Sequence, residues 1–145
     1  RWPIREMTSH SETETAAVAA AMAAGFHGGE VVLLSGELGA GKTAFVRGLA
    51  RGLGADPDEV ASPTFVLLTA YPGRLTLHHA DLYRLKDPSL LLGQLEAALE
   101  GARLGLVEWG EPHLLGASHL LRLSPEGEAR RAELWEVGPG EEKGV

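Results

Sequence analysis

Residues 36–43, GELGAGKT, place two of their three glycines, a lysine and a threonine in the spacing G-x-x-x-x-G-K-[ST] of a phosphate-binding loop. The glycines let the backbone close around an anion, so that successive N–H groups point at it. The ammonium of Lys42 can reach the outer phosphates of a nucleotide, and the Thr43 hydroxyl can bind Mg²⁺. The pattern therefore predicts a nucleoside triphosphate site, with contacts from Glu37, Leu38, Gly39, Ala40, Gly41, Lys42, Thr43 and Ala44.

The segments on either side of this loop have the composition of a strand and a helix. The apolar run 31–34 precedes the loop and is typical of a buried strand. Residues 44–53 follow with the spacing of an amphipathic helix, and Gly54 stands where a helix commonly ends. The positive end of that helix's dipole would point at the phosphates. The alternative is a glycine-rich turn that only caps a helix, but Lys42 is one of just three lysines in the chain.

Two carboxylates at predicted strand ends are candidates for the metal ion. Nucleotide hydrolysis is largely electrostatic, so the site needs Mg²⁺ and a carboxylate that orients it. Glu108 follows an apolar pair at the end of a predicted strand and is the leading candidate, although Asp is more usual at this position. The alternative is a strand-end glutamate that faces solvent. Asp81 ends another predicted strand, on the same face as Leu77 and His79 because side chains alternate along a strand.

Two further groups of polar residues have competing interpretations. His78, His79 and Asp81 could bind a transition metal, but adjacent strand residues point to opposite faces, so both histidines cannot reach one ion without distortion. Ser62 and Thr64 could belong to a segment that senses the γ-phosphate, with Thr64 touching the metal. The proline between them is equally consistent with the plain start of a strand.

The length and charge limit the class of protein. A chain of 145 residues suits a single domain spanning 1–145, in which we expect residues 1–10 and 138–145 to be frayed. The net charge of −7 argues against tight autonomous binding to nucleic acid, which requires Lys and Arg to neutralise phosphates. The absence of cysteine excludes disulfides and thiolate metal sites. No apolar stretch approaches the span of a bilayer. The acidic charge balance suits a protein whose partners are other proteins, and we expect a cytoplasmic protein.

Two helices besides the one after the loop are expected. Ser11 and Glu14 fit a capping box that starts an alanine-rich helix extending to about Phe26. A further helix is expected to begin at Pro88 and to continue to about Glu100.

The remaining apolar segments predict strands. Residues 66–71 and 74–81 predict one hairpin, and residues 119–124 and 129–137 predict a second. Residues 104–109 form a short apolar run that predicts a buried strand. Strands that alternate with helices, together with two hairpins, predict an α/β fold of three layers with a mixed, mostly parallel sheet.

Four stretches taken together resemble the TsaE (YjeE) family: the loop at 36–43, SPTF at 62–65, DLYRL at 81–85 and EW at 108–109. The loop alone is unspecific, but the other three in this order and spacing are close to diagnostic, and the resemblance covers residues 11–137. The family consists of small bacterial ATPases required for making threonylcarbamoyladenosine in tRNA. The resemblance therefore implies a P-loop NTPase fold, ATP and Mg²⁺ as cofactors, and TsaD and TsaB as partners, with tRNA involved only through that complex.

The resemblance also implies roles for individual residues. The magnesium residues of the family correspond to Thr43 and Glu108, and the aspartate needed for activity corresponds to Asp81. With Lys42 from the loop, Asp81 and Glu108 are the expected catalytic residues. The tryptophan next to the glutamate, here Trp109, is also functionally sensitive in the family.

A threonine of the first helix and an arginine near the C-terminus lie by the nucleotide in the family, and Thr15 and Arg130 match them. The chain departs from the family at two positions. Glu37 replaces the commoner Asp in the loop, and Gly110 stands where Pro is usual, which loosens the chain after the magnesium glutamate.

The predicted function is the binding and hydrolysis of Mg-ATP in support of the TsaB–TsaD complex. No arginine finger is evident beyond Arg84, so we expect hydrolysis to be slow alone and faster with the partners. A small-molecule kinase would need a lid with several arginines, yet residues 85–104 contain only Lys86 and Arg103 as cations. A GTPase needs an asparagine to read guanine, and the chain has none. The other alternative is a nucleotide-sensing subunit without hydrolysis.

Overall fold

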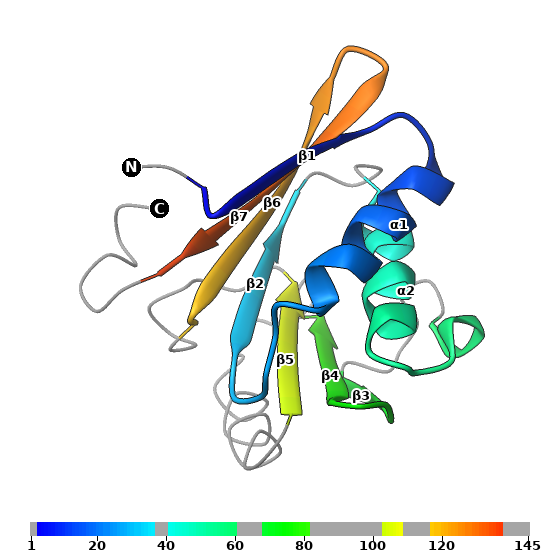
Figure 1. Ribbon diagram of the computed structural model, residues 1–145, viewed down its shortest axis with the longest axis vertical. Helices are drawn as coiled ribbons and strands as arrows, with labels where there is room; N and C mark the ends of the chain where they lie inside the picture. The colour runs from blue at the N-terminus through cyan, green and yellow to red at the C-terminus, as the bar shows by residue number, and fades with distance from the viewer. Residues whose placement is uncertain (1–2, 37–40, 61–67, 82–102, 109–116, 138–145) are drawn as a thin grey trace.

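The computed structural model describes residues 3–36, 41–60, 68–81, 103–108 and 117–137, which contain seven strands and two α-helices (Figure 1). In chain order the elements are β1 (Arg5–Ser9), α1 (Glu12–Ala23), β2 (Val31–Ser35), α2 (Lys42–Gly52), the 3₁₀ helix η1 (Pro57–Glu59), β3 (Leu68–Tyr71), β4 (Thr76–Asp81), β5 (Arg103–Glu108), β6 (His119–Glu126) and β7 (Ala129–Glu136).

The seven strands form one sheet in the order β1-β7-β6-β2-β5-β4-β3. At its centre β6, β2, β5 and β4 are parallel neighbours. β3 and β7 are antiparallel to the strands beside them, and β1 pairs antiparallel with β7. Five strands, β1, β2, β4, β5 and β6, therefore run in one direction, which confirms the predicted mixed, mostly parallel sheet.

Both helices lie side by side on one face of the sheet (Figure 1). Alternate strand residues such as Val32, Leu34 and Leu106 pack with α1 and α2 in the main core. Leu33 and Val107, whose side chains point to the other face, are buried as well. A sheet that is buried on both faces fits the predicted three-layer α/β architecture. The helix expected over 88–100 lies outside the described residues.

The backbones of α1 and α2 approach very closely. A β-carbon added at Gly48 would lie 2.1 Å from the carbonyl oxygen of Ala16, and one added at Gly52 would lie 2.6 Å from that of Ala20. Both distances are well below van der Waals contact, so only glycine fits at these two positions without a shift of the helices. The two helices therefore run in the same direction, and their packing sets where the first turn of α1 lies relative to the start of α2.

The predicted local elements are confirmed with small changes of boundary. The hairpins β3–β4 and β6–β7 are present, and β5 is the strand expected over 104–109. α1 begins after Ser11 as expected but ends at Ala23, and a turn then carries Phe26 into the core. α2 already begins at Lys42. In the described ranges, neither helix has the length and apolar character needed to cross a membrane.

The expectation that residues 1–10 are frayed is wrong for Arg5–Ser9, which form β1. This strand pairs with β7 along its whole length, and Met7 packs against the main core. A five-residue edge strand with one apolar side chain has almost no periodic signal in its sequence, because most of its side chains remain exposed. Residues 138–145, also expected to be frayed, lie outside the described part of the chain.

His78, which is buried, and His119, which is half-buried, are expected to make the stability of this fold depend on pH. Burial lowers the pKa of His78 below its ordinary value of 6.5, and the nearby charge of Arg103 lowers it further. Burial also lowers the pKa of His119, although Glu30 and Glu136 partly oppose that shift. As pH falls through 6.5, the unfolded chain therefore binds more protons than the folded chain, and protonation favours unfolding.

We accordingly expect the free energy of unfolding to be smaller at pH 5.5 than at pH 7.5. Chemical denaturation at the two pH values measures this difference in the free energy of unfolding. The difference should be smaller in a His119→Gln variant, because glutamine does not titrate in this range. Equal unfolding free energies of the wild-type chain at both pH values would contradict the prediction.

Candidate functional site

The carboxyl ends of the central parallel strands and the first turn of α2 meet at one edge of the sheet, the upper edge in Figure 1. β2 ends at Ser35 just before the loop, β5 ends at Glu108, and β4 ends at Asp81. In the register of β4 and β5, Asp81 lies beside Glu108. The topology thus brings together the two carboxylate residues that the sequence analysis selected, although the side chain of Asp81 is outside the described part.

Glu108 is held between Lys42 and His79. The Nζ atom of Lys42 lies 3.8 Å from Oε1 of Glu108, and Nε2 of His79 lies 2.5 Å from Oε2. The side chains of Lys42 and Glu108 are each only 9% exposed, so water screens their attraction weakly. Such burial is incompatible with the alternative of a glutamate that faces solvent. The structure therefore joins two of the three predicted catalytic residues in a buried ion pair.

Gly41 lies directly before Lys42 and shapes the start of α2. Its backbone has φ 92° and ψ 19°, a left-handed conformation that costs a residue with a β-carbon about 1–2 kcal/mol. Glycine has no side chain that could cap the helix, so the N–H groups of the first turn are left for another acceptor, and an anion suits them. Thr43 and Ala44, half-buried, belong to this first turn.

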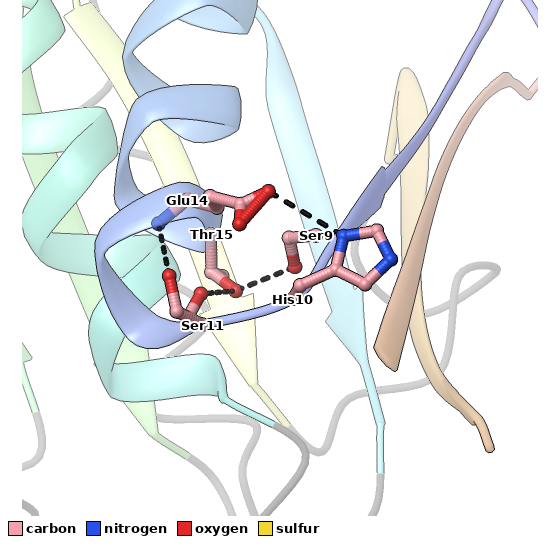
Figure 2. Close-up of polar contacts among 5 residues, drawn as sticks. All are labelled: Ser9, His10, Ser11, Glu14 and Thr15. Atoms are coloured by element: carbon pink, nitrogen blue, oxygen red, sulfur yellow. Dashed lines mark hydrogen bonds and ion pairs between the residues drawn. The ribbon is translucent and has the colours of Figure 1, made fainter. Parts of the chain in front are cut away.

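A hydrogen-bonded network joins the end of β1 to the first turn of α1 (Figure 2). Ser11 Oγ accepts the N–H of Glu14 at 3.1 Å, which confirms the predicted cap, while the Glu14 carboxylate pairs with His10 Nδ1 at 3.5 Å. Thr15 Oγ1 donates to the Ser11 carbonyl at 3.0 Å and lies 2.7 Å from Ser9 Oγ. Because the one hydroxyl proton of Thr15 is used on Ser11, Ser9 is the donor to Thr15.

Strand pairing places Arg130 next to this network, so two predicted nucleotide neighbours that lie far apart in sequence, Thr15 and Arg130, are both adjacent to Ser9. The methyl carbon of Thr15 is 3.8 Å from where a β-carbon on Gly41 would lie, so Thr15 adjoins the start of α2. Ser9 is directly opposite Arg130 in the register of β1 and β7, and cross-strand partners share a face. Arg130 therefore lies on the helix-bearing face of the sheet, at the same edge as the strand ends. Ser9, which connects the two, has no recognisable pattern around it in the sequence.

The available donors suit Mg²⁺ better than a transition metal. Mg²⁺ typically takes one or two protein ligands and completes its shell with water and phosphate oxygens, a role that the Glu108 carboxylate and the Thr43 hydroxyl fit. His79 turns toward Glu108, whereas Nε2 of His78 is buried without a hydrogen-bond partner among the described residues. Within those ranges, no cluster of three His, Asp or Glu residues could hold a metal ion. The transition-metal alternative gains no support.

Part of the predicted site lies outside the described residues. The residues outside the described part of the chain are Glu37, Leu38, Gly39 and Ala40 of the loop, together with Ser62, Thr64, Arg84 and Trp109. The sequence pattern predicts that His79 and Asp81 share one face of a strand, but it does not predict the contact of His79 with Glu108. The missing information was the pairing of that strand with β5.

A family model described as threonylcarbamoyl adenosine biosynthesis protein TsaE matches residues 9–132. Two curated relatives carry the name tRNA threonylcarbamoyladenosine biosynthesis protein TsaE. The protein from Treponema pallidum is 51% identical over 85 residues, which are 57% of this chain and 62% of the relative. The protein from Rickettsia bellii is 45% identical over 111 residues, covering 73% of this chain and 76% of the relative. The match to the Treponema relative thus spans less than two thirds of that protein's length.

A solved structure has the same architecture. The crystal structure of Bacillus subtilis YdiB superimposes with a TM-score of 0.67 at 30% sequence identity, covering 92% of this chain and 86% of that one. The similarity therefore extends over most of the chain, well beyond the predicted phosphate-binding loop.

Proposed function

The chain belongs to the TsaE family of threonylcarbamoyl adenosine biosynthesis proteins, and from that premise we propose that it binds and hydrolyses Mg-ATP in support of the TsaB–TsaD complex. The observation that carries the proposal is the buried ion pair between Lys42 and Glu108. Lys42 is the first residue of α2 and follows directly after Gly41, whose backbone is left-handed. A cation, a carboxylate and a helix N-terminus at one point are what a site for a magnesium-bound triphosphate requires.

In this proposal the phosphates lie against the first turn of α2. The N–H groups there and the Lys42 ammonium bind the phosphate oxygens, while Thr43 and Glu108 would hold Mg²⁺. When bound, the ion supplies positive charge that neutralises the outer phosphates. Because the Lys42 and Glu108 side chains are almost entirely buried, their charges act with little screening by water.

The remaining site residues act around this centre. Asp81 ends β4 beside Glu108, a position from which we propose that it helps to place the attacking water. Thr15 adjoins Gly41 through its methyl group, and its hydroxyl is already bonded to Ser9 and Ser11. We therefore assign Thr15 a role in shaping the start of α2, next to the nucleotide.

We further propose that hydrolysis is slow alone and accelerated by TsaB–TsaD. Two arginines of the described residues have structural contacts that direct their guanidinium groups elsewhere: Arg47 donates to the carbonyl of Val60, and Arg74 to those of Ala23 and Phe26. A cation supplied in trans can raise the rate of phosphoryl transfer by about 10³–10⁵. Hydrolysis would then reset the complex between rounds instead of driving the tRNA chemistry.

The test is phosphate release from ATP by this chain, alone and while TsaB–TsaD is titrated. We expect slow release alone, a rise with the partners, and a large loss in both settings for Glu108→Gln, which keeps the size of the side chain and removes its charge. A flat profile on titration would discard the role of the partners. Nucleotide binding without phosphate release in any setting would instead favour the nucleotide-sensing subunit, and failure to bind adenosine nucleotides would overturn the whole proposal.

A further inference from the structure

His79 makes a short, buried contact with the proposed magnesium carboxylate. It lies on β4 in register with Leu106 of β5, so Glu108 is its diagonal neighbour on the same face of the sheet. His79 Nε2 lies 2.5 Å from Glu108 Oε2, within hydrogen-bonding distance, and because a carboxylate oxygen only accepts, the ring N–H is the donor. The side chains are 15% and 9% exposed, so little water is available to compete for this bond.

The two oxygens of Glu108 consequently have different surroundings. Oε1 lies on the side of Lys42, at 3.8 Å, and Oε2 is taken by His79. A glutamate side chain has three rotatable bonds, and its terminal carboxylate torsion is broad, so the ion pair with Lys42 alone would leave the carboxylate plane free to turn. An N–H donor on Oε2 removes that freedom and leaves Oε1 directed toward the start of α2.

We propose that His79 is a positioning residue that holds the Glu108 carboxylate in the orientation needed to receive Mg²⁺. This inference rests on the proposed function, because it concerns how the same site binds its metal ion. Carboxylates that bind metals are commonly held by a second hydrogen bond, and loss of such a partner typically lowers metal affinity or activity by about 10–100-fold. His79 does not itself contact the ion or the nucleotide in this proposal.

A purely structural role for His79 makes a different prediction. If the bond only stabilised the pairing of β4 with β5, its loss would lower the unfolding free energy and leave the magnesium requirement unchanged. A positioning role predicts that more Mg²⁺ is needed for tight nucleotide binding, while nucleotide affinity in the absence of Mg²⁺ stays the same. The two roles are therefore separable in binding measurements that need no hydrolysis.

The experiment is calorimetric titration of ADP into the full chain, with excess EDTA and over a series of Mg²⁺ concentrations. His79→Ala is expected to raise the Mg²⁺ concentration for half-maximal enhancement of binding by about 10–100-fold. His79→Gln should recover part of the loss, since its amide N–H reaches about as far as Nε2 of histidine, whereas the shorter His79→Asn should not. His78→Gln is the matched control, because it changes the neighbouring histidine on the opposite face of the same strand.

The outcomes separate the two proposals. If Mg²⁺ does not enhance ADP binding to the wild-type chain, the proposed function fails and this inference fails with it. If wild type responds to Mg²⁺ and His79→Ala responds equally, only the positioning role is overturned. Equal weakening of ADP binding with and without Mg²⁺ also overturns it, because His79 would then act on the loop. Thermal melting of each variant shows whether the compared proteins are folded. If the His79→Ala variant is not folded, the contrast between His79→Gln and His79→Asn decides whether His79 has the positioning role.

Discussion

Replacing Lys42 with alanine is expected to reduce ATP hydrolysis by about 100-fold or more, because a single preorganised charge at a reacting centre is commonly worth about 10²–10³ in rate. Lys42 is the first residue of α2, and its ammonium lies 3.8 Å from Glu108 within a region that is almost closed to water. The variant removes the cation that we propose for the outer phosphates. Steady-state phosphate release with and without TsaB–TsaD measures the effect.

The same variant leaves Glu108 buried with one partner fewer. His79 still donates to Oε2, so we expect the fold to survive with a lower melting temperature. Arg51→Ala is the matched control, because it removes an exposed cation from the last turn of the same helix. Unchanged hydrolysis in Lys42→Ala, or an equal loss in both variants, would contradict the role given to Lys42.

Replacing Gly48 with alanine is expected to destabilise the protein, although alanine is the better helix former by about 1 kcal/mol. The new β-carbon would lie 2.1 Å from the Ala16 carbonyl oxygen and 2.5 Å from its Cα, which are backbone atoms that cannot move alone. Forcing extra atoms into a packed interface typically costs about 1–3 kcal/mol. For a chain of this size, each kcal/mol corresponds to a melting temperature lower by about 2–4 °C.

The separation of α1 from α2 also has a functional consequence. Thr15 adjoins Gly41 because the two helices pack backbone to backbone, so a displaced α1 moves Thr15 away from the start of α2. We therefore expect weaker ADP binding as well as a lower melting temperature. Gly25→Ala is the control, since its β-carbon would meet the Met22 carbonyl oxygen at an ordinary 3.4 Å. A Gly48→Ala variant as stable as Gly25→Ala would show that the helices can adjust without cost.

The local elements of the site could be read from the sequence because each depends on residues close together in the chain. Gly41 of the predicted loop adopts a left-handed conformation that suits glycine, and the predicted helix begins directly after it. Ser11 caps α1 as its type and position predicted. The two hairpins follow from alternating residues around short turns. In all these cases the decisive interactions span only a few residues.

The contacts that complete the site could not be read in this way. The pairing of His79 with Glu108 depends on β4 lying beside β5 in one register, and a shift by one residue would turn His79 to the opposite face. The hydrogen bond of Thr15 with Ser9, and the place of Arg130 opposite Ser9, both need β1 at the edge of the sheet, where the sequence suggested a frayed end. Gly48 and Gly52 look like weak points of a helix until α1 is placed against them.

The sequence by itself determined the prediction of a phosphate-binding loop, the candidate carboxylates and the general α/β class, because these are carried by residue types at short, fixed spacings. Only the tertiary structure decided which side chain holds each oxygen of Glu108 and how the first helix reaches the start of the second. The reason is physical: strand order, register and helix crossing arise from packing between distant segments, and no local pattern specifies them.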